Sequence, residues 1–393
     1  MNNLNHKIFR PAWIDVDVDA ISQNVQNIKK FVGNTRLLAV VKADGYGLGA
    51  IPVSQTVIKN GADMLGVVML DEAIELRQAG ITAPILNMGP IFPEQVETVL
   101  ELNLEQMVYK QNVVRALSEA AGKQQTSAKV HIKIDTGMSR YGMHFSEAVN
   151  RIIKFSKYDH IEIVGAFTHF PKSDAVDKSF ALLQVERIKN IKWELESRGV
   201  NIPVWHMANS GGTLDLPESH FNMVRVGLMN YGYFPSQDVK RPFELYPAMH
   251  VRAKIAAVKD IHRGDTVGYG RKFIAERDER IAVLPIGYAD GYDRKLSKIG
   301  QVLLNGRIAP IIGGLCMDAA FIKISEFPDA GVGDTVTLMG KDGEEEISPH
   351  FIAELTESVS YEVISTFGRR LPRIYWRNGE IIEIDNRLLR LDD

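Results

Sequence analysis

Short apolar runs alternate with amphipathic stretches through roughly the first 230 residues of the chain. The runs predict eight strands, at residues 37–41, 64–69, 84–88, 106–109, 130–134, 161–167, 203–207 and 223–227. Apolar positions with helical spacing lie between most of them, at residues 71–79, 94–100, 113–121, 146–155 and 180–198. Eight strands that alternate with helices favour a (β/α)8 barrel over an open doubly wound sheet.

Two further elements precede this series. Residues 13–18 alternate apolar and acidic side chains, as a half-exposed strand does. Asp19 is a candidate N-cap for a helix over residues 20–32.

The texture of the chain changes after about Pro242. Long helical patterns give way to short alternating runs separated by turn residues, with one helix predicted at 349–356. The runs lie at residues 250–259, 280–286, 301–304, 308–312, 320–324, 335–338 and 381–384. We therefore expect an α/β protein in which a (β/α)8 TIM barrel over residues 12–241 precedes a mostly β domain. The β domain would span residues 242–393, and we expect residues 1–11 to associate with it.

Composition and charge narrow the functional classes. The chain has 393 residues, 45% apolar and 24% charged, and its net charge of −3 gives no electrostatic case for nucleic acid or an anionic membrane. Cys316 is the single cysteine, so we expect no intrachain disulfide and no cysteine-rich zinc site. We also expect no bound metal. No secretory signal or membrane-spanning stretch is visible. We expect a cytoplasmic protein without nucleic-acid or membrane partners.

Residues 37–50, LLAVVKADGYGLGA, combine a buried strand with a lysine and three glycines. A charged lysine is costly to bury at a strand end, and Lys42 in this position could form a Schiff base with a carbonyl group. The motif from Gly45 to Ala50 also satisfies the dinucleotide-binding fingerprint, with Asp71 at about the expected distance. A glycine-rich turn beside a surface lysine is a third interpretation. The stretch alone does not decide among the three.

Other polar residues also follow predicted strands, and a barrel brings such positions together at one rim. Each alone has a structural explanation, such as an ion pair, a satisfied histidine or a turn. Their shared placement favours a functional site, formed by Lys42, Lys133, Asp135, Arg140, His169, Asn209, Ser210, Arg225 and Gly227.

Two of these positions suit a phosphate group. Ser210 offers a hydroxyl, and the glycines beside it let backbone N–H groups approach an anion. Gly227 and Leu228 follow the eighth strand, where barrels commonly hold phosphate. A phosphate site opposite a strand-end lysine describes a pyridoxal phosphate pocket better than a dinucleotide pocket.

Eight motifs occur in an order that resembles the alanine racemase family of fold-type III pyridoxal phosphate enzymes. They are VVKADGYG, KIDTGMSRYG, FTHF, ANSGGTLDLP, VRVGLMNYG, VGYG, LPIGYADGYDR and CMD, and the resemblance covers about residues 12–376. It implies a (β/α)8 barrel, a C-terminal β domain and pyridoxal 5'-phosphate as cofactor. It also implies a homodimer whose active sites borrow residues from the partner's C-terminal domain.

The resemblance implies a role for each matching residue. Lys42 matches the lysine that holds the cofactor, and Tyr269 matches a second base that enters from the other subunit, although by itself it reads as an ordinary strand or turn tyrosine. Arg225 resembles the residue that faces the pyridine nitrogen, and His169 the histidine that links it to the catalytic tyrosine.

The remaining matches concern binding and support. Arg140 resembles the residue near the cofactor's phenolic oxygen and the substrate carboxylate. The Met317 backbone, with Asp318 beside it, resembles a carboxylate-binding segment, and Tyr288 an entrance residue. Lys133 corresponds to a lysine that is carbamylated in some members. The phosphate-site matches are Tyr46, Ser210, Gly227, Leu228 and Tyr361.

The resulting hypothesis is a racemase that interconverts L-alanine and D-alanine by two-base Cα proton transfer and supplies D-alanine for peptidoglycan. Departures from the usual pattern at Asp44-Gly45, at Leu48 and at 171–173 leave a serine or broader-range racemase open. An NAD-dependent dehydrogenase that uses residues 45–50, and a pyridoxal phosphate carrier without enzymatic activity, are the alternatives from other classes.

Overall fold

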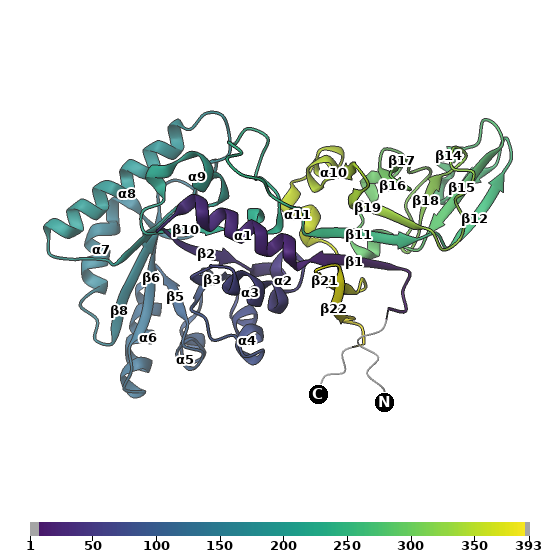
Figure 1. The fold of residues 1–393 in the computed structure, drawn as a ribbon. Coiled ribbons are helices and arrows are strands. Elements are labelled where there is room, and N and C mark those ends of the chain that lie inside the picture. Colours follow the sequence, from purple (N-terminus) through teal and green to yellow (C-terminus); the bar gives the residue numbers. More distant parts are fainter. Residues whose placement is uncertain (1–7, 390–393) are drawn as a thin grey trace. The chain divides into compact units, whose positions relative to one another are not determined.

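The computed structural model describes residues 8–389, which form two compact units (Figure 1). One unit contains residues 21–45 and 50–246. The other contains the described residues up to Ala20, residues 46–49, and the described residues from Pro247 onward. The short segment 46–49 thus lies with the second unit although the residues on either side of it belong to the first.

The first unit is a parallel eight-stranded barrel, and all eight predicted strands are present. The strands are β2 (Arg36–Val40), β3 (Met64–Val67), β4 (Ile85–Asn87), β5 (Glu105–Val108), β6 (Ala128–Asp135), β8 (Ile161–Phe167), β9 (Val204–His206) and β10 (Met223–Val226). The pairing order runs β10-β2-β3-β4-β5-β6-β8-β9. Two hydrogen bonds between β9 and β10 residues and their flanks close the circle: Asn222 N–H donates to Trp205 O, and Arg225 N–H to Ala208 O.

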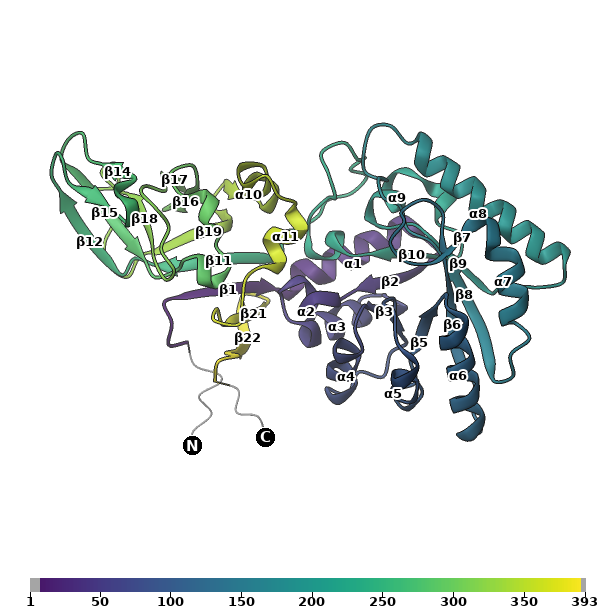
Figure 2. The same ribbon diagram turned by 180° about the vertical axis from the view of Figure 1, so that it is seen from behind.

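Helices cover the outside of this barrel, as Figure 2 shows for α6, α7 and α8 beside β6 and β8. Helix α7 buries Ala148, Val149, Ile152 and Phe155, the spacing of a single helical face. The helices of the N-terminal part of the chain are α1 (Val18–Val32), α2 (Lys42–Tyr46), α3 (Ala50–Lys59), α4 (Leu70–Gln78), α5 (Val96–Glu101), α6 (Gln111–Lys123), α7 (Ala148–Phe155), α8 (Ser179–Ser197) and α9 (Ser210–Asp215).

The predicted cap of α1 was wrong by two residues. The helix begins at Val18, and the Asp17 carboxylate accepts hydrogen bonds of 2.9 Å from the backbone N–H groups of Asp19 and Ala20. An acceptor directly before the first turn satisfies two backbone donors that have no partner within the helix.

The second unit is mostly β, as predicted. Its largest sheet has the order β17-β16-β19-β11-β1-β21-β22, a smaller sheet has the order β12-β15-β18, and β13 pairs with β14. The strands are β1 (Ala12–Asp17), β11 (Met249–Lys254), β12 (Ala257–Ile261), β13 (Thr266–Val267), β14 (Phe273–Ile274), β15 (Glu279–Leu284), β16 (Gln301–Leu304), β17 (Arg307–Pro310), β18 (Ala320–Lys323), β19 (Thr335–Asp342), β20 (Glu345–Ile347), β21 (Arg373–Arg377) and β22 (Glu380–Asp385). Its helices are α10 (Pro349–Thr356) and α11 (Ser360–Ser365).

Strand β1 lies within the range 12–241 predicted for the barrel, but it pairs with strands of the second unit. It runs antiparallel to β11 and parallel to β21, with Ile14 opposite Val251 and Arg373. Arg10 forms an ion pair with Asp290, and Lys254 N–H donates to Pro11 O, so these two N-terminal residues also contact this unit. Residues 1–7 of the predicted association lie outside the described residues.

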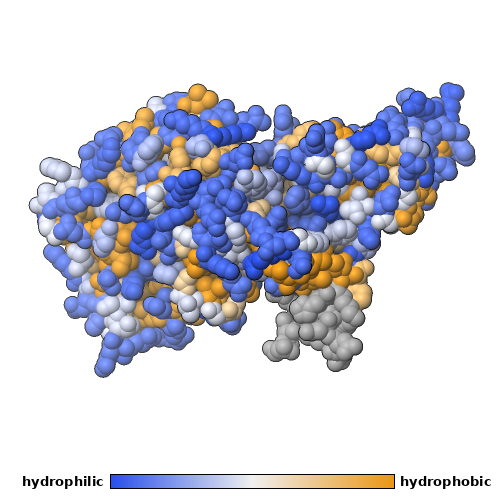
Figure 3. All heavy atoms as spheres, in the orientation of Figure 1, coloured by the Kyte–Doolittle hydropathy of each residue, from blue (hydrophilic) through white to orange (hydrophobic). Residues whose placement is uncertain are grey.

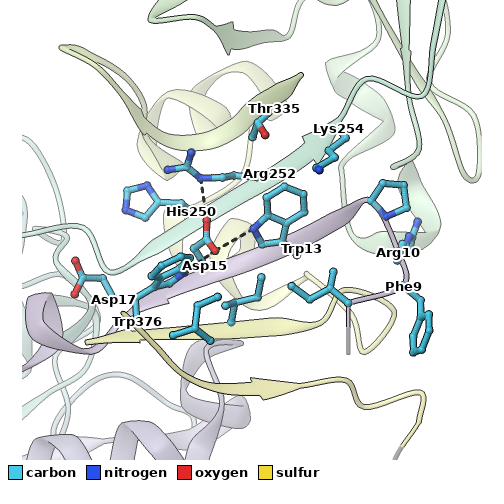
Figure 4. A pocket seen from close by; sticks show the side chains of 14 residues that line it. Phe9, Arg10, Trp13, Asp15, Asp17, His250, Arg252, Lys254, Thr335 and Trp376 are labelled. Carbon is cyan, nitrogen blue, oxygen red and sulfur yellow. Dashed lines mark hydrogen bonds and ion pairs between the residues drawn. The ribbon is translucent and has the colours of Figure 1, made fainter. Parts of the chain in front are cut away.

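Residues of the large sheet line a pocket of about 760 Å³ (Figure 4). At its centre the Asp15 carboxylate accepts hydrogen bonds from the indole N–H groups of Trp13 and Trp376, at 2.9 and 2.8 Å, and lies 2.9 Å from Arg252 Nε. Burial raises the pKa of Asp15, although these three partners oppose the effect. None of the predicted site residues lines this pocket.

The surface view in Figure 3 shows hydrophilic residues over much of the visible face, with hydrophobic residues in patches between them. Within residues 8–389, no helix combines the length and apolar content that crossing a membrane requires. The same residues contain no group of three or more His, Cys, Asp or Glu side chains arranged to hold a metal ion.

The barrel is closely packed where Gly89 follows β4. A Cβ atom at this position would lie 1.7 Å from the backbone oxygen of Val68. Because backbone cannot swing aside as a side chain can, we expect Gly89→Ala to lower the free energy of unfolding by about 2–3 kcal/mol. The measurement is urea denaturation followed by circular dichroism.

Gly331→Ala is the matched control for this substitution. A Cβ at Gly331 meets no atom within 4 Å. We expect its effect to stay within about 0.5 kcal/mol. Equal unfolding midpoints for the two variants would contradict the packing argument.

Candidate active site

Lys42 follows β2 directly and is held by an unusual turn. Ala43, Asp44 and Gly45 adopt left-handed backbone conformations, with φ values of 50°, 57° and 58°. Such a conformation costs a non-glycine residue about 1–2 kcal/mol. Hydrogen bonds of the surrounding barrel compensate: Ala43 N–H donates to Glu72 Oε1 at 2.7 Å, and Gly45 N–H donates to Val41 O at 2.9 Å. The turn therefore places Lys42 at the catalytic rim of the barrel.

The glycines after Lys42 serve close packing within the second unit. A Cβ on Gly47 would lie 2.7 Å from Ile364 O, and one on Gly49 would lie 2.0 Å from the Tyr375 hydroxyl. The buried Arg373 guanidinium donates from both Nε and Nη2 to Gly47 O, at 3.1 and 3.0 Å. These contacts explain the glycine spacing without a dinucleotide.

Arg225 on β10 is only 4% exposed and organises the barrel rim. Its Nη2 donates to His169 Nδ1 at 3.1 Å and to Thr168 O at 2.9 Å, and its Nη1 donates to His206 Nδ1 at 3.1 Å. Because a guanidinium has only donors, His169 Nδ1 is the acceptor, and the proton of the neutral ring lies on Nε2. Burial and then the positive charge of Arg225 hold the pKa of His169 well below its ordinary value.

The electrostatics of this rim favour neutral amines. Burial lowers the pKa of Lys133 far below its ordinary value, and Arg225 and Arg140 lower it further. Burial followed by Arg140 also lowers the pKa of Lys42, while Glu72 opposes the shift. The unprotonated amine is the nucleophilic form of lysine, so both side chains are prepared to attack an electrophile.

Arg140 follows an ordered loop after β6. The Asp135 carboxylate accepts hydrogen bonds from the backbone N–H groups of Gly137, Met138 and Ser139, at 2.9, 3.0 and 3.1 Å. These bonds keep the pKa of Asp135 low despite its partial burial. The loop ends in an exposed guanidinium whose charge acts on Lys42, Lys133 and Arg225.

The predicted phosphate-site residues of the barrel lie together. Ser210 begins α9, and the preceding Asn209 side chain caps this helix by accepting from Gly212 N–H at 3.0 Å. Gly227 N–H donates to Ser210 Oγ at 3.4 Å, and Leu228 follows Gly227 directly. In the second unit the rings of Tyr46 and Tyr361 lie with their centres 6.3 Å apart.

Tyr269 stands in the turn between β13 and β14 of the second unit, and its side chain is 78% exposed. The hairpin itself is anchored, because Val267 packs in a buried cluster with Ile281 and Ile312, and Phe273 packs against that cluster. An exposed tyrosine on a rigid hairpin is available to a neighbouring molecule.

Tyr288 and Met317 are brought together by backbone pairing. Tyr288 N–H donates to Cys316 O and Ala289 N–H donates to Met317 O, both at 3.1 Å. Both predicted side chains are exposed. Arg370 forms ion pairs with Asp318, which follows Met317, and with the fully buried Asp290.

Sequence reasoning missed His206 and Glu72, which contact Arg225 and the Lys42 turn. His206 ends β9, so it has the same strand-end position that singled out His169, but it was not predicted as a site residue. Glu72 bonds the backbone of Ala43 from 29 residues away, and no local pattern marks such a contact.

Comparison with known proteins identifies the family. The model of the alanine racemase N-terminal domain matches residues 16–235, and that of the C-terminal domain matches residues 248–375. The chain belongs to the alanine racemase family. As a member, it is a pyridoxal-phosphate-dependent isomerase that interconverts L-alanine and D-alanine, so the dehydrogenase and carrier interpretations are wrong.

Individual relatives cover almost the whole chain. An alanine racemase from Clostridium tetani is 40% identical over 97% of this chain and 99% of its own length. The solved structure of an alanine racemase from Clostridium difficile has a TM-score of 0.93 and 37% identity, covering 98% of this chain and all of that one. A histidine racemase from Leuconostoc mesenteroides has a TM-score of 0.86 and 29% identity, covering 95% and 100%.

The residues of the barrel rim fit pyridoxal phosphate. Covalent attachment of the cofactor's aldehyde needs an unprotonated lysine amine, and burial lowers the pKa of Lys42. A phosphate needs hydroxyl and backbone donors, and Ser210, Gly227 and Leu228 lie together after the last two barrel strands. Arg225 is a buried donor whose bonds to His169 and His206 fix its orientation.

The lowered pKa of the buried Lys133 amine predicts a reaction with carbon dioxide. A neutral amine adds to CO2 and releases a proton, which leaves a carbamate anion that Arg140 and Arg225 would stabilise. We expect a single carbamate signal in 13C NMR after addition of labelled bicarbonate at neutral pH, and we expect Lys133→Met to remove it.

Lys129 provides the matched control because it lies on the same strand but is exposed. Its side chain lacks the burial and the neighbouring arginines that act on Lys133. Lys129→Met should therefore leave the signal unchanged. A signal that survives Lys133→Met, or that Lys129→Met removes, would contradict the assignment.

Proposed function

We propose that Lys42 and Tyr269 are the two bases of the racemisation, with Tyr269 supplied by the partner subunit. The proposal rests on two observations: Lys42 at the barrel rim is partly buried with a lowered pKa, and Tyr269 is 78% exposed on an anchored hairpin. When bound, pyridoxal phosphate supplies the electron withdrawal that acidifies the substrate's Cα proton.

Racemisation needs proton removal on one face of Cα and proton delivery on the other, so one base on each face is the simplest arrangement. In our proposal Lys42 takes the proton of D-alanine and Tyr269 that of L-alanine. A tyrosine accepts a proton only as its phenolate, and a hydrogen bond donated by His169 Nε2 would stabilise that form.

Arg225 would face the pyridine nitrogen of the cofactor and limit side reactions. Burial, followed by Arg140, lowers the pKa of Arg225 to about 9, so the guanidinium remains charged at neutral pH. A group that only donates hydrogen bonds keeps the ring nitrogen unprotonated, which weakens electron withdrawal. Rapid return of the proton is then favoured over transamination.

The other matched residues would bind and admit the substrate. Arg140 and the Met317 backbone, with Asp318, would hold the substrate carboxylate, and Tyr288 would line the entrance. Ser210, Gly227, Leu228, Tyr46 and Tyr361 would hold the phosphate, and Lys133 would support Arg140. As a homodimer in the cytoplasm, the enzyme would supply D-alanine for peptidoglycan precursors.

Tyr269→Phe removes the proposed phenolic base and keeps the ring. We expect incorporation of solvent deuterium at Cα of L-alanine to fall about 100-fold or more, because a positioned base contributes about 10²–10⁴-fold. Cofactor binding, followed by the visible absorption spectrum, should be unchanged. Chiral chromatography measures the D-alanine formed, with L-serine and L-histidine as comparison substrates.

Tyr158→Phe removes the same atom from a tyrosine whose hydroxyl accepts a hydrogen bond from Gln111 on the barrel's outer side. This control should racemise L-alanine at the wild-type rate. Wild-type exchange by Tyr269→Phe would exclude the two-base assignment. D-Serine or D-histidine as the main product would exclude alanine as the preferred substrate.

A mixture of two inactive variants tests whether subunits share the active site. If each site combines Lys42 of one chain with Tyr269 of its partner, a heterodimer of Lys42→Ala and Tyr269→Phe chains contains one intact site. Random reassortment of equal amounts should restore about a quarter of wild-type activity, since half the dimers are mixed and one of their two sites is intact. Sites built within single chains would give no recovery.

A further inference from the structure

A line of buried polar side chains runs through the barrel from Arg225 to Glu105. Arg225 Nη1 lies 3.1 Å from His206 Nδ1, His206 Nε2 lies 2.8 Å from His131 Nδ1, and His131 Nε2 lies 2.6 Å from Glu105 Oε2. Both histidines are about 1% exposed. The line joins four strands, β10, β9, β6 and β5, whose labels can be followed in Figure 2.

The two ends of this line force one direction on every hydrogen bond. A guanidinium only donates, so His206 Nδ1 must accept and the His206 proton must lie on Nε2. That proton is donated to His131 Nδ1, which places the His131 proton on Nε2. A carboxylate only accepts, so Glu105 takes this last hydrogen bond. Starting from either end gives the same two neutral tautomers.

A glycine on the strand between the two histidines leaves room for their contact. His131 on β6 and His206 on β9 are separated by β8, where Gly165 is the register partner of His131. A Cβ on Gly165 would lie 2.2 Å from His131 Nδ1, inside the ring's contact distance. The missing side chain at this position leaves the space in which the two imidazoles meet.

Through the two histidines, this line connects Arg225 to the carboxylate of Glu105. The remaining hydrogen bonds of Arg225 go to neutral acceptors: His169 Nδ1 and the backbone oxygens of Thr168 and Met207. Glu105 begins β5 at the N-terminal end of the barrel, where its side chain is 20% exposed. A partly hydrated carboxylate costs less to keep charged than one buried beside Arg225.

We propose that Glu105 and His131 are positioning residues for Arg225. Together with Arg225 at the other end, Glu105 fixes both tautomers so that His206 presents a lone pair to Arg225 Nη1, and this bond sets the orientation of the guanidinium. The functional consequence rests on the proposed role of Arg225 toward the cofactor ring. With the tautomers in this direction, Arg225 would be free to donate toward the cofactor. With both tautomers reversed, the N–H at His206 Nδ1 would face the N–H of Arg225 Nη1, and two donors cannot form a hydrogen bond.

The test compares Glu105→Leu with Glu105→Gln by 15N NMR of the full-length protein labelled at histidine. In the wild type we expect both His131 and His206 to carry the proton on Nε2. Gln keeps an acceptor oxygen, so its tautomers and kcat should match the wild type. Leu removes the acceptor and leaves Arg225 as the only end of the line that favours the original direction. We therefore expect the reversed pair, with the proton on Nδ1 of His131 and of His206, to become populated, and kcat to fall about tenfold or more with less change in KM.

The visible spectrum of bound cofactor is the second readout, and it should change in Glu105→Leu but not in Glu105→Gln. Glu162→Leu is the matched control, since Glu162 is an exposed glutamate near the start of β8 outside the line. Unchanged tautomers in Glu105→Leu would overturn the proposal, as would a wild-type Nδ1–H tautomer at either histidine.

The NMR measurement needs neither cofactor nor substrate, so its outcome is independent of the proposed function. Reversed tautomers with unchanged kcat and unchanged cofactor spectrum would overturn the positioning role of Glu105. Reversed tautomers with a lowered kcat, rescued by Gln, would support it. A packing defect alone would lower activity without moving the histidine protons.

Discussion

A single buried guanidinium determines the chemistry of the barrel rim. Arg225 can only donate hydrogen bonds, so every group around it must accept, and His169, His206 and two backbone oxygens do so. Its charge also lowers the pKa of each neighbouring base, including Lys133, His169 and His206. Burial is the larger cause of these shifts, and the fixed cation adds to it, so both effects favour the neutral forms of the three groups.

The turn at Lys42 shows how the barrel compensates for strain at its reactive end. Three consecutive left-handed residues are unfavourable in isolation, but Glu72 on α4 accepts hydrogen bonds from the backbone of Ala43 through one oxygen and of Val68 through the other. The same carboxylate raises the pKa of Lys42 and so moderates the effect of burial. Glu72 thus links the geometry of the turn to the reactivity of the lysine that it presents.

The barrel was predictable because its strands are buried on both faces and read as apolar runs bounded by polar residues. The grouping of site residues at the rim was predictable from the same pattern, because residues at the ends of parallel barrel strands lie at one end of the barrel. Contacts between distant segments left no such pattern. The pairing of β1 with β11, the Arg10–Asp290 ion pair and the His131–Glu105 bond depend on packing that no local sequence spacing reports.

The proposed site residues fall into two groups, one buried in the barrel and one exposed. Groups that must be neutral or fixed in one orientation, such as Lys133 and Arg225, are buried in the barrel, where low polarity shifts their pKa and neighbours hold them. Tyr269, in its proposed role, would need neither effect from its own unit, and it is among the most exposed large hydrophobic side chains of the described residues. A residue that acts in the site of another subunit has to be exposed in its own chain. The burial that a catalytic tyrosine requires would then come from assembly, and activity would depend on subunit concentration as well as on the fold.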